Sequence, residues 1–240
     1  SVYSTSKQSG DYIVDITNEL LVEKIFNKIN PEIVIHCAAF TDVDKAEQNI
    51  KEATSINEKG TENLVKNINH NTHFIYISTD QVYPNSNGPH VEGTENPINS
   101  YGSSKYKGAL IVKKHVSKYT ILHTNLFGRS LNNSKISFVD NIIKKLKKGL
   151  SIQLYSDAYF SPLNLFTFSE IIEKIIKNNV YGTYNLGSRN GMSKEMFIRH
   201  LANHLNLKIT SSRSVESKTL DRAAKRPLDL RLEVKKIEKK

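Results

Sequence analysis

A tyrosine and a lysine four residues apart are the side chains in this sequence best suited to acid–base chemistry. Tyr101 and Lys105 belong to the string Tyr-Gly-Ser-Ser-Lys, and on a helix this spacing puts both on one face. A lysine ammonium near a phenol favours the phenolate and lowers the phenol pKa. The tyrosine then becomes a usable acid at neutral pH. Because both residue types are common, the spacing alone is weak support for a catalytic site.

Hydroxyl and carboxyl side chains that follow apolar runs form a second group of candidates. Thr79 and Asp80 come just after the run at 73–77, where a hydroxyl can hydrogen-bond a substrate carbonyl oxygen. Thr41 and Asp42 follow an earlier run in the same way. Both pairs have an equally good structural explanation, because Ser, Thr and Asp commonly cap turns and helices.

The elements that must position these residues alternate between strands and helices. Short apolar runs are typical of buried parallel strands, and the patterns between them have helical periodicity. This alternation predicts an α/β fold with a Rossmann-like, doubly wound parallel sheet. The strand-like runs are 33–37, 73–77 and 120–124, and the helical patterns between them cover 53–68 and 103–116.

Ligands of such sheets bind beyond the carboxyl ends of the strands, which here are 38–41, 78–80 and 125–128. His36 is predicted to be a hydrogen-bonded strand residue rather than a metal ligand, and no metal site is expected. After residue 128 the pattern changes. We predict a nucleotide-binding domain over 1–130 and a smaller α/β part over 131–240, which mainly binds substrate and crosses back to the sheet.

Composition and charge narrow the class of protein. The 240 residues include one cysteine, Cys37, which excludes a disulfide framework. No apolar run approaches the roughly 20 residues of a membrane-spanning helix, and no signal peptide opens the chain, so we expect a cytoplasmic protein without a membrane partner. The net charge of +10 favours phosphate ligands. Its lysines lie on one helix face and at the chain end without a nucleic-acid-binding motif, so no nucleic-acid partner is expected.

Longer strings, taken together, are more specific than any single motif. They resemble the dTDP-4-dehydrorhamnose reductase family, extended short-chain dehydrogenases/reductases of nucleotide-sugar and polysaccharide biosynthesis. The resemblance extends over about residues 11 to 235. The strings that carry it are 38–47, 78–83, 97–102, 182–185 and 226–229.

The resemblance implies a reaction and roles for the candidate residues. In that family a hydride from NADPH or NADH reduces the 4-keto group of a nucleotide-linked deoxysugar. Tyr101 would then be the proton donor, and Lys105 would hold the nicotinamide ribose and tune Tyr101. Thr79 would bind the reacting carbonyl oxygen, and Asp80 would contact the sugar together with Thr79.

Other positions are assigned to cofactor and substrate by the same resemblance. Asp15 and Ile16 would lie near the adenine, and Asn125 and Leu126 would face the substrate. Many family members carry a tryptophan near that strand end and this chain has none, so the sugar stays open. A 2′-phosphate would sit near residues 4–7, which favours NADPH over NADH, although a solvated loop explains those residues equally well. The cofactor would be lined by Ala38, Ala39, Phe40 and Thr41.

One departure from the family pattern leaves alternatives open. The Gly-rich loop that holds the cofactor pyrophosphate in such enzymes is missing here, since Gly10 stands alone and the next glycine is Gly60. We therefore expect the chain to be a fragment that lacks the first strand, loop and helix, and to bind cofactor poorly. A non-catalytic nucleotide-binding regulatory subunit of the same fold, similar to the beta subunit of methionine adenosyltransferase, is the alternative function. A homodimer is also left open.

Overall fold

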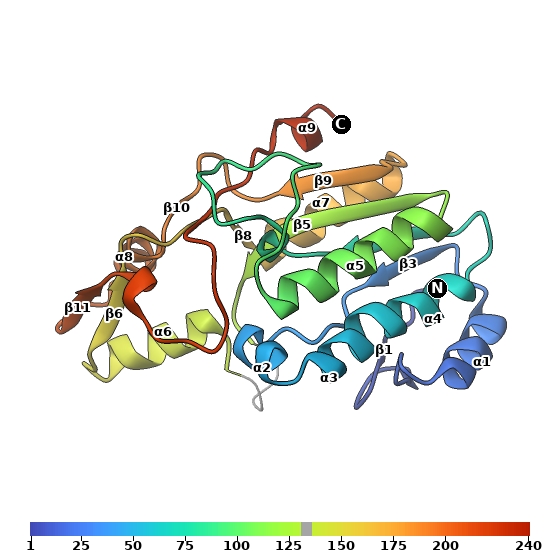
Figure 1. The fold of residues 1–240 in the computed structure, drawn as a ribbon, viewed down its shortest axis with the longest axis horizontal. Coiled ribbons are helices and arrows are strands. Elements are labelled where there is room, and N and C mark those ends of the chain that lie inside the picture. The colour runs from blue at the N-terminus through green and yellow to red at the C-terminus, as the bar shows by residue number, and fades with distance from the viewer. Residues whose placement is uncertain (131–135) are drawn as a thin grey trace.

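The computed structural model describes residues 1–130 and 136–240, and a five-stranded parallel sheet forms its centre (Figure 1). The order runs β3–β4–β5, after which β9 pairs with the first half of β5 and β8 with the second half. The predicted α/β fold with a Rossmann-like parallel sheet is confirmed. The strands are β3 (Ile33–His36), β4 (His73–Ile77), β5 (Tyr119–Phe127), β8 (Pro162–Asn164) and β9 (Gly182–Leu186).

Helices cover both faces of this sheet, so its strands are apolar on both sides. On one face Phe74 and Tyr76 of β4, fully buried, pack against Val112 of α5. On the other face Ile75 and Ile172 pack in a separate cluster. The first face is covered by α1 (Glu19–Ile29), α4 (Gly60–Lys66) and α5 (Ser100–His115), and the second by α7 (Leu165–Lys177).

The helical pattern predicted over 53–68 forms three joined pieces. It starts as α3 (Ile50–Thr54), passes through one π-helical turn, η1 (Ser55–Lys59), and continues as α4. The turn buries Asn57, which is 1% exposed. A π turn inside a helix is frequently a functional feature, and this one lies next to α5.

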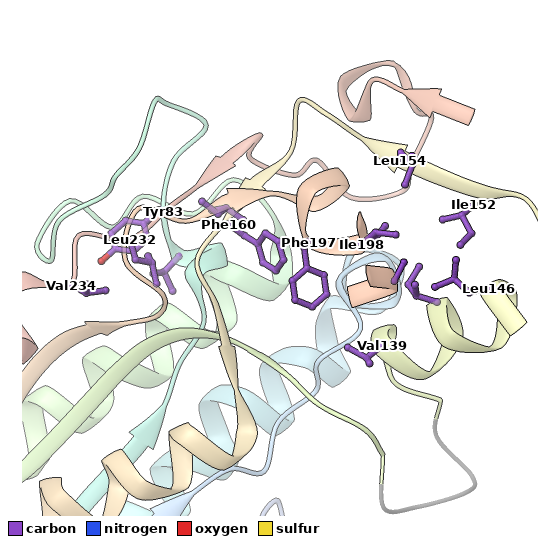
Figure 2. Packing of buried hydrophobic residues seen from close by; sticks show 14 residues of the cluster. Tyr83, Val139, Leu146, Ile152, Leu154, Phe160, Phe197, Ile198, Leu232 and Val234 are labelled. Carbon is purple, nitrogen blue, oxygen red and sulfur yellow. The ribbon is translucent and has the colours of Figure 1, made fainter. Parts of the chain in front are cut away.

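A smaller lobe packs beside the carboxyl end of the sheet, and Figure 2 shows its apolar core. Phe197 of α8 lies edge-on to Phe160, with ring centroids 5.5 Å apart. Because β8, α7 and β9 return to the sheet from residues 162–186, the division at residue 130 stays a prediction. The lobe contains α6 (Phe138–Lys147), β6 (Ile152–Tyr155), β7 (Tyr159–Phe160), β10 (Met192–Ser193), α8 (Lys194–His204), β11 (Ser212–Val215), η3 (Ser217–Thr219) and β12 (Asp229–Leu230).

The remaining elements lie at the ends of the chain and beside the sheet. β1 (Thr5–Ser6) pairs with β2 (Tyr12–Ile13) in a separate parallel ribbon. α2 (Val43–Gln48) follows β3, and α9 (Lys235–Glu238) packs on β9. None of the helices in the described part of the chain has the length and hydropathy needed to cross a membrane.

Candidate active site

Helix α5 carries both residues of the tyrosine–lysine pair, and its first turn is held in place by two local features. Asn99 caps the helix by accepting a hydrogen bond from the backbone N–H of Gly102 at 2.8 Å. A Cβ at Gly102 would lie 2.2 Å from the carbonyl oxygen of Gln81, so only glycine permits this approach. The close contact sets α5 against the 3-10 turn η2 (Asp80–Val82), which follows β4.

Thr79 and Tyr101 meet at this contact. Thr79 caps η2 by accepting a hydrogen bond from the N–H of Gln81 at 3.2 Å, as the structural explanation of this residue predicts. The hydroxyl of Thr79 lowers the pKa of the Tyr101 phenol, but burial has the larger effect and raises the Tyr101 pKa to about 12. Tyr101 is 9% exposed and is therefore protonated at neutral pH, as a proton donor must be.

The expectation that Lys105 lowers the pKa of Tyr101 is wrong for this geometry. The Lys105 ammonium lies 4.1 Å from the ring centroid of Tyr76, where a cation–π contact holds it. Lys105 is only 2% exposed. Desolvation lowers its own pKa to about 7, so near neutral pH it is only partly charged. Burial therefore dominates the titration of both residues.

Asp80 and Asn125 join the ends of two neighbouring strands. The side-chain amide of Asn125 donates to Asp80 Oδ2 at 2.6 Å, and the Thr79 hydroxyl donates to Oδ1 at 3.3 Å. Burial raises the pKa of Asp80 to about 6. Leu126, predicted to face substrate together with Asn125, packs instead in the apolar cluster on the α7 face. The structure thus brings Asn125 to Thr79 and Asp80, but it does not bring the Leu126 side chain there.

The loop at 38–41, predicted to line the cofactor, is clamped by a residue that sequence reasoning missed. Asn57 accepts from the N–H of Phe40 at 2.8 Å and donates to its carbonyl oxygen at 3.1 Å. The same amide donates to Ser104 Oγ of α5 at 2.9 Å. Asn57 therefore ties this loop to the helix that carries Tyr101 and Lys105. An asparagine inside a predicted helix was the only signal in the sequence.

Replacing Asn57 with alanine is expected to lower stability by about 2–3 kcal/mol, because the N–H and C=O of half-buried Phe40 lose their partners. We also expect a higher KM for the cofactor, since Phe40 belongs to the predicted cofactor loop. Chemical denaturation and steady-state kinetics would measure both effects. Ser104→Ala is the matched control, because it removes one bond to Asn57 and leaves Phe40 paired. Loss of stability without a change in KM would contradict the positioning role.

The residues predicted near the adenine lie on the segment that follows β2. Asp15 forms an ion pair with Lys7 at 2.8 Å, and the hydrogen bonds from Lys7 and Thr17 lower its pKa to about 2. Ile16 packs closely under Gly60, and its carbonyl oxygen accepts from Asn63 at 2.9 Å. The segment is thus held against α4.

A nicotinamide cofactor is the group that the sequence implies, and polar atoms near Lys105 fit it. The hydroxyl of Ser78, 6% exposed, is buried without a hydrogen-bond partner. Strand alternation puts Ser78 on the same side of the sheet as Tyr76, whose ring carries the Lys105 ammonium. An orphaned hydroxyl beside a desolvated ammonium suits the hydroxyl groups of a ribose. His36, in contrast, is hydrogen-bonded to Thr61 at 3.0 Å, which confirms it as a strand residue with an internal partner.

The chain's later segments also reach this site. Arg226 pairs with Asp44 of α2 at 2.5 Å, and Asp44 also accepts from the N–H of Ala224 at 3.2 Å. Asn99, the cap of α5, donates to the carbonyl oxygen of Lys225 at 3.0 Å. Figure 1 shows the segment between η3 and β12 passing between the small lobe and the sheet. These contacts of Asn99 and Asp44 were not predicted.

Comparison with known proteins identifies the family. The RmlD substrate binding domain family matches residues 1–240. The dTDP-4-dehydrorhamnose reductase of Aggregatibacter actinomycetemcomitans is 31% identical over 186 residues, which cover 72% of this chain and 60% of that protein. The dTDP-4-dehydrorhamnose reductase of Bacillus anthracis, solved in complex with NADP, is 31% identical with a TM-score of 0.84, covering 94% of this chain and 80% of that one.

One further relative is not named as a reductase. Methionine adenosyltransferase 2 subunit beta of Danio rerio is 21% identical over 234 residues, which cover 93% of this chain and 71% of that protein. The match to the family, however, extends over the whole chain, and the fold agrees with that of a solved reductase. This chain therefore belongs to the RmlD substrate binding domain family, a family of NAD(P)-dependent sugar-nucleotide reductases.

Proposed function

We propose that this protein uses NADPH or NADH to reduce the 4-keto group of a nucleotide-linked deoxysugar. The observation that carries the proposal is the buried contact between Thr79 and a protonated Tyr101 at the carboxyl end of β4. Family membership and the NADP named with the Bacillus anthracis structure support it. The supports for a cofactor site are Lys105, the orphaned hydroxyl of Ser78 and the clamped loop at 38–41.

The chain's own residues would handle the carbonyl oxygen and its proton. A bound reduced nicotinamide would supply the hydride for C4 of the sugar. Thr79 donates a hydrogen bond to the carbonyl oxygen, and Tyr101 gives that oxygen its phenolic proton, so the ketone becomes an alcohol. Lys105 would hold the nicotinamide ribose. Asp80, anchored by Asn125, would accept hydrogen bonds from sugar hydroxyls.

The test is turnover by the intact protein. NADPH and, separately, NADH are mixed with a nucleotide-linked 4-keto-6-deoxysugar, and loss of the absorbance of reduced nicotinamide is followed. Formation of the 4-hydroxy sugar nucleotide in equal amount supports the proposal. Binding of both ligands without any turnover would contradict it.

A non-catalytic regulatory subunit is the second candidate, favoured by the similarity to methionine adenosyltransferase 2 subunit beta. A buried, protonated Tyr101 next to Thr79 is more than a nucleotide-binding scaffold requires, so the enzyme is preferred. A stable complex with a partner protein, together with no turnover, would reverse this preference.

The choice between NADPH and NADH leads to a separate prediction. Lys7 is 74% exposed and its only ion-pair partner among the described residues is Asp15. Replacing Lys7 with alanine is expected to raise KM for NADPH by up to about tenfold and no more, because solvent screens a surface cation that faces a 2′-phosphate. KM for NADH should stay unchanged. Lys24→Ala on α1 is the matched control, and equal effects on both cofactors would contradict the assignment.

A further inference from the structure

A buried histidine–glutamate pair joins β5 to the loop that leads into α5, and the proposed reaction does not use it. Nε2 of His123 lies 3.0 Å from Oε1 of Glu95, across 28 positions of the sequence. The two side chains are only 1% and 3% exposed. Burial of a charged group is unfavourable unless the group is paired and hydrogen-bonded. The retention of such a pair inside the molecule therefore calls for a reason.

The pair is held together through one nitrogen of the imidazole. Burial alone would raise the pKa of Glu95, but the hydrogen bonds from His123 and from backbone N–H groups, including that of Gly93 at 3.1 Å, lower it to about 2. A carboxylate can only accept, so Nε2 carries the proton. Burial lowers the pKa of His123, and Glu92 and Lys113 are the other charged groups near it. Within the described ranges, 1–130 and 136–240, Nδ1 of His123 has no hydrogen-bond partner.

On the strand side, His123 supports the end of β5 and the turn that follows β4. His123 and Asn125 are alternate residues of β5, so their side chains lie on the same face of the sheet. The amide of Asn125 donates to Asp80, the first residue of η2, at 2.6 Å. The ring of Tyr83, which ends η2, lies edge-on to His123 with centroids 5.6 Å apart. His123 thus packs between the strand end and the turn that Thr79 caps.

On the loop side, Glu95 supports the entry to α5. The next residue, Asn96, donates from its backbone N–H to the carbonyl oxygen of Val82 at 2.9 Å. Glu95 therefore fixes the loop at the point where the loop binds η2, just before the helix that carries Tyr101 begins. The bond between His123 and Glu95 joins the two elements whose contact brings Thr79 and Tyr101 together.

We propose that His123, through its Nε2 bond to Glu95, is a positioning residue for the reduction. The bond holds Thr79 on η2 and Tyr101 on α5 at the separation at which both reach one carbonyl oxygen. The inference rests on the proposed function, because this separation matters only if both residues act on the same substrate group. A misplacement of about 1 Å can lower a rate by about 100-fold. The predicted cofactor loop at 38–41 follows a different strand, so cofactor binding should not depend on the pair.

Two amide substitutions separate the Nε2 bond from the polarity of the side chain. Glutamine can place its NH₂ group near the position of Nε2, whereas the shorter asparagine reaches only the position of Nδ1. His123→Gln should keep kcat within about threefold, and His123→Asn should lower kcat by about 10- to 100-fold with KM for NADPH within about twofold. Thr124→Val is the matched control, because it removes from the same strand a buried hydroxyl without a hydrogen-bond partner among the described residues.

A second measurement reads the geometry without turnover. Backbone-amide NMR spectra of the full chain report the N–H of Gln81, which donates to Thr79, and the N–H of Gly102, which donates to Asn99. These two signals belong to η2 and to the first turn of α5. Both should shift in His123→Asn and stay in place in His123→Gln.

The outcomes distinguish the inference from the proposed function. Equal kcat values in the two amide variants, whether high or low, would overturn the inference, because the Nε2 bond would then make no difference. If His123→Asn does not fold, Glu95→Ala and Glu95→Gln make the same comparison from the loop side, since only glutamine keeps an acceptor for Nε2. An unmodified protein without turnover, whose NMR signals still shift in His123→Asn alone, would refute the proposed function and leave the positioning role intact.

Discussion

Replacing Tyr101 with phenylalanine is expected to lower kcat by about 10³-fold while leaving the fold intact. A general acid contributes about 10²–10⁴ to such a rate, and Tyr101 is the buried, protonated hydroxyl next to Thr79. The substitution removes a single oxygen from a residue that packs against Ala46 and Ala53. KM for the cofactor should change little, because Lys105 and the loop at 38–41 are untouched. Stopped-flow or steady-state oxidation of NADPH measures the effect.

The control for this prediction lies on the same helix. Tyr106 is half-buried and packs against the small-lobe core. Tyr106→Phe should keep kcat within about twofold of the unmodified protein, a change of at most about 0.4 kcal/mol in the activation free energy. A Tyr101→Phe protein that binds cofactor and retains kcat would show that the proton comes from another group.

Replacing Lys105 with methionine is expected to abolish cofactor-dependent turnover and, at the same time, to stabilise the protein. Lys105 is 2% exposed, and burial lowers its pKa from 10.5 to about 7. Methionine fills a similar volume and has no charge to desolvate. A pKa difference of this size corresponds to several kcal/mol in the free energy of unfolding, although loss of the cation–π contact with Tyr76 offsets part of the gain. We expect the Tm to rise by at least about 5 °C at pH 6.

The pH dependence of this stabilisation follows from the two pKa values. Below pH 7 Lys105 is protonated in both the folded and the unfolded chain. The folded state is therefore destabilised by the full desolvation of the charged ammonium. Between pH 7 and 10.5 the folded chain releases the proton and the unfolded chain keeps it, so the stability of the unmodified protein rises with pH. The advantage of Lys105→Met should therefore be largest below pH 7 and small by pH 10.

Two further measurements separate function from stability at Lys105. The kcat/KM of the unmodified protein should fall as pH rises through about 7, because the charged form of Lys105 is lost from the free enzyme. Lys113→Met, a position in the last turn of the same helix, serves as the control for replacement of a lysine in α5. If Lys105→Met were less stable than the unmodified protein at pH 6, the buried ammonium would have a compensating partner and the pKa argument would be wrong.

Most of the fold could be predicted from the sequence, because its determinants are local. The apolar run at 73–77 is the strand β4 with the same bounds. The run at 120–124 is longer in the structure, since β5 reaches Phe127 by pairing with β8. That extension depends on a partner about 40 residues away in the chain, which no local pattern indicates.

The candidate site was predicted in part for the same reason. The spacing of Tyr101 and Lys105 and the position of Thr79 after a strand are local features, and the structure places all three around the start of α5. The direction of the Lys105 side chain depends on a residue that is distant in the sequence. It is decided by the ring of Tyr76 on the neighbouring strand, so Lys105 does not lower the Tyr101 pKa, which burial raises.

By itself, the sequence determined the class of fold, the strand ends where a ligand is proposed to bind and the chemical groups available there, because periodicity and residue type act over a few positions. Only the tertiary structure decided how those groups are buried and joined. It set the ion pair of Arg226 with Asp44 across 182 positions and the clamp of Asn57 on Phe40. Burial and long-range charge depend on what packs around a side chain, and that packing exists only once the chain has folded.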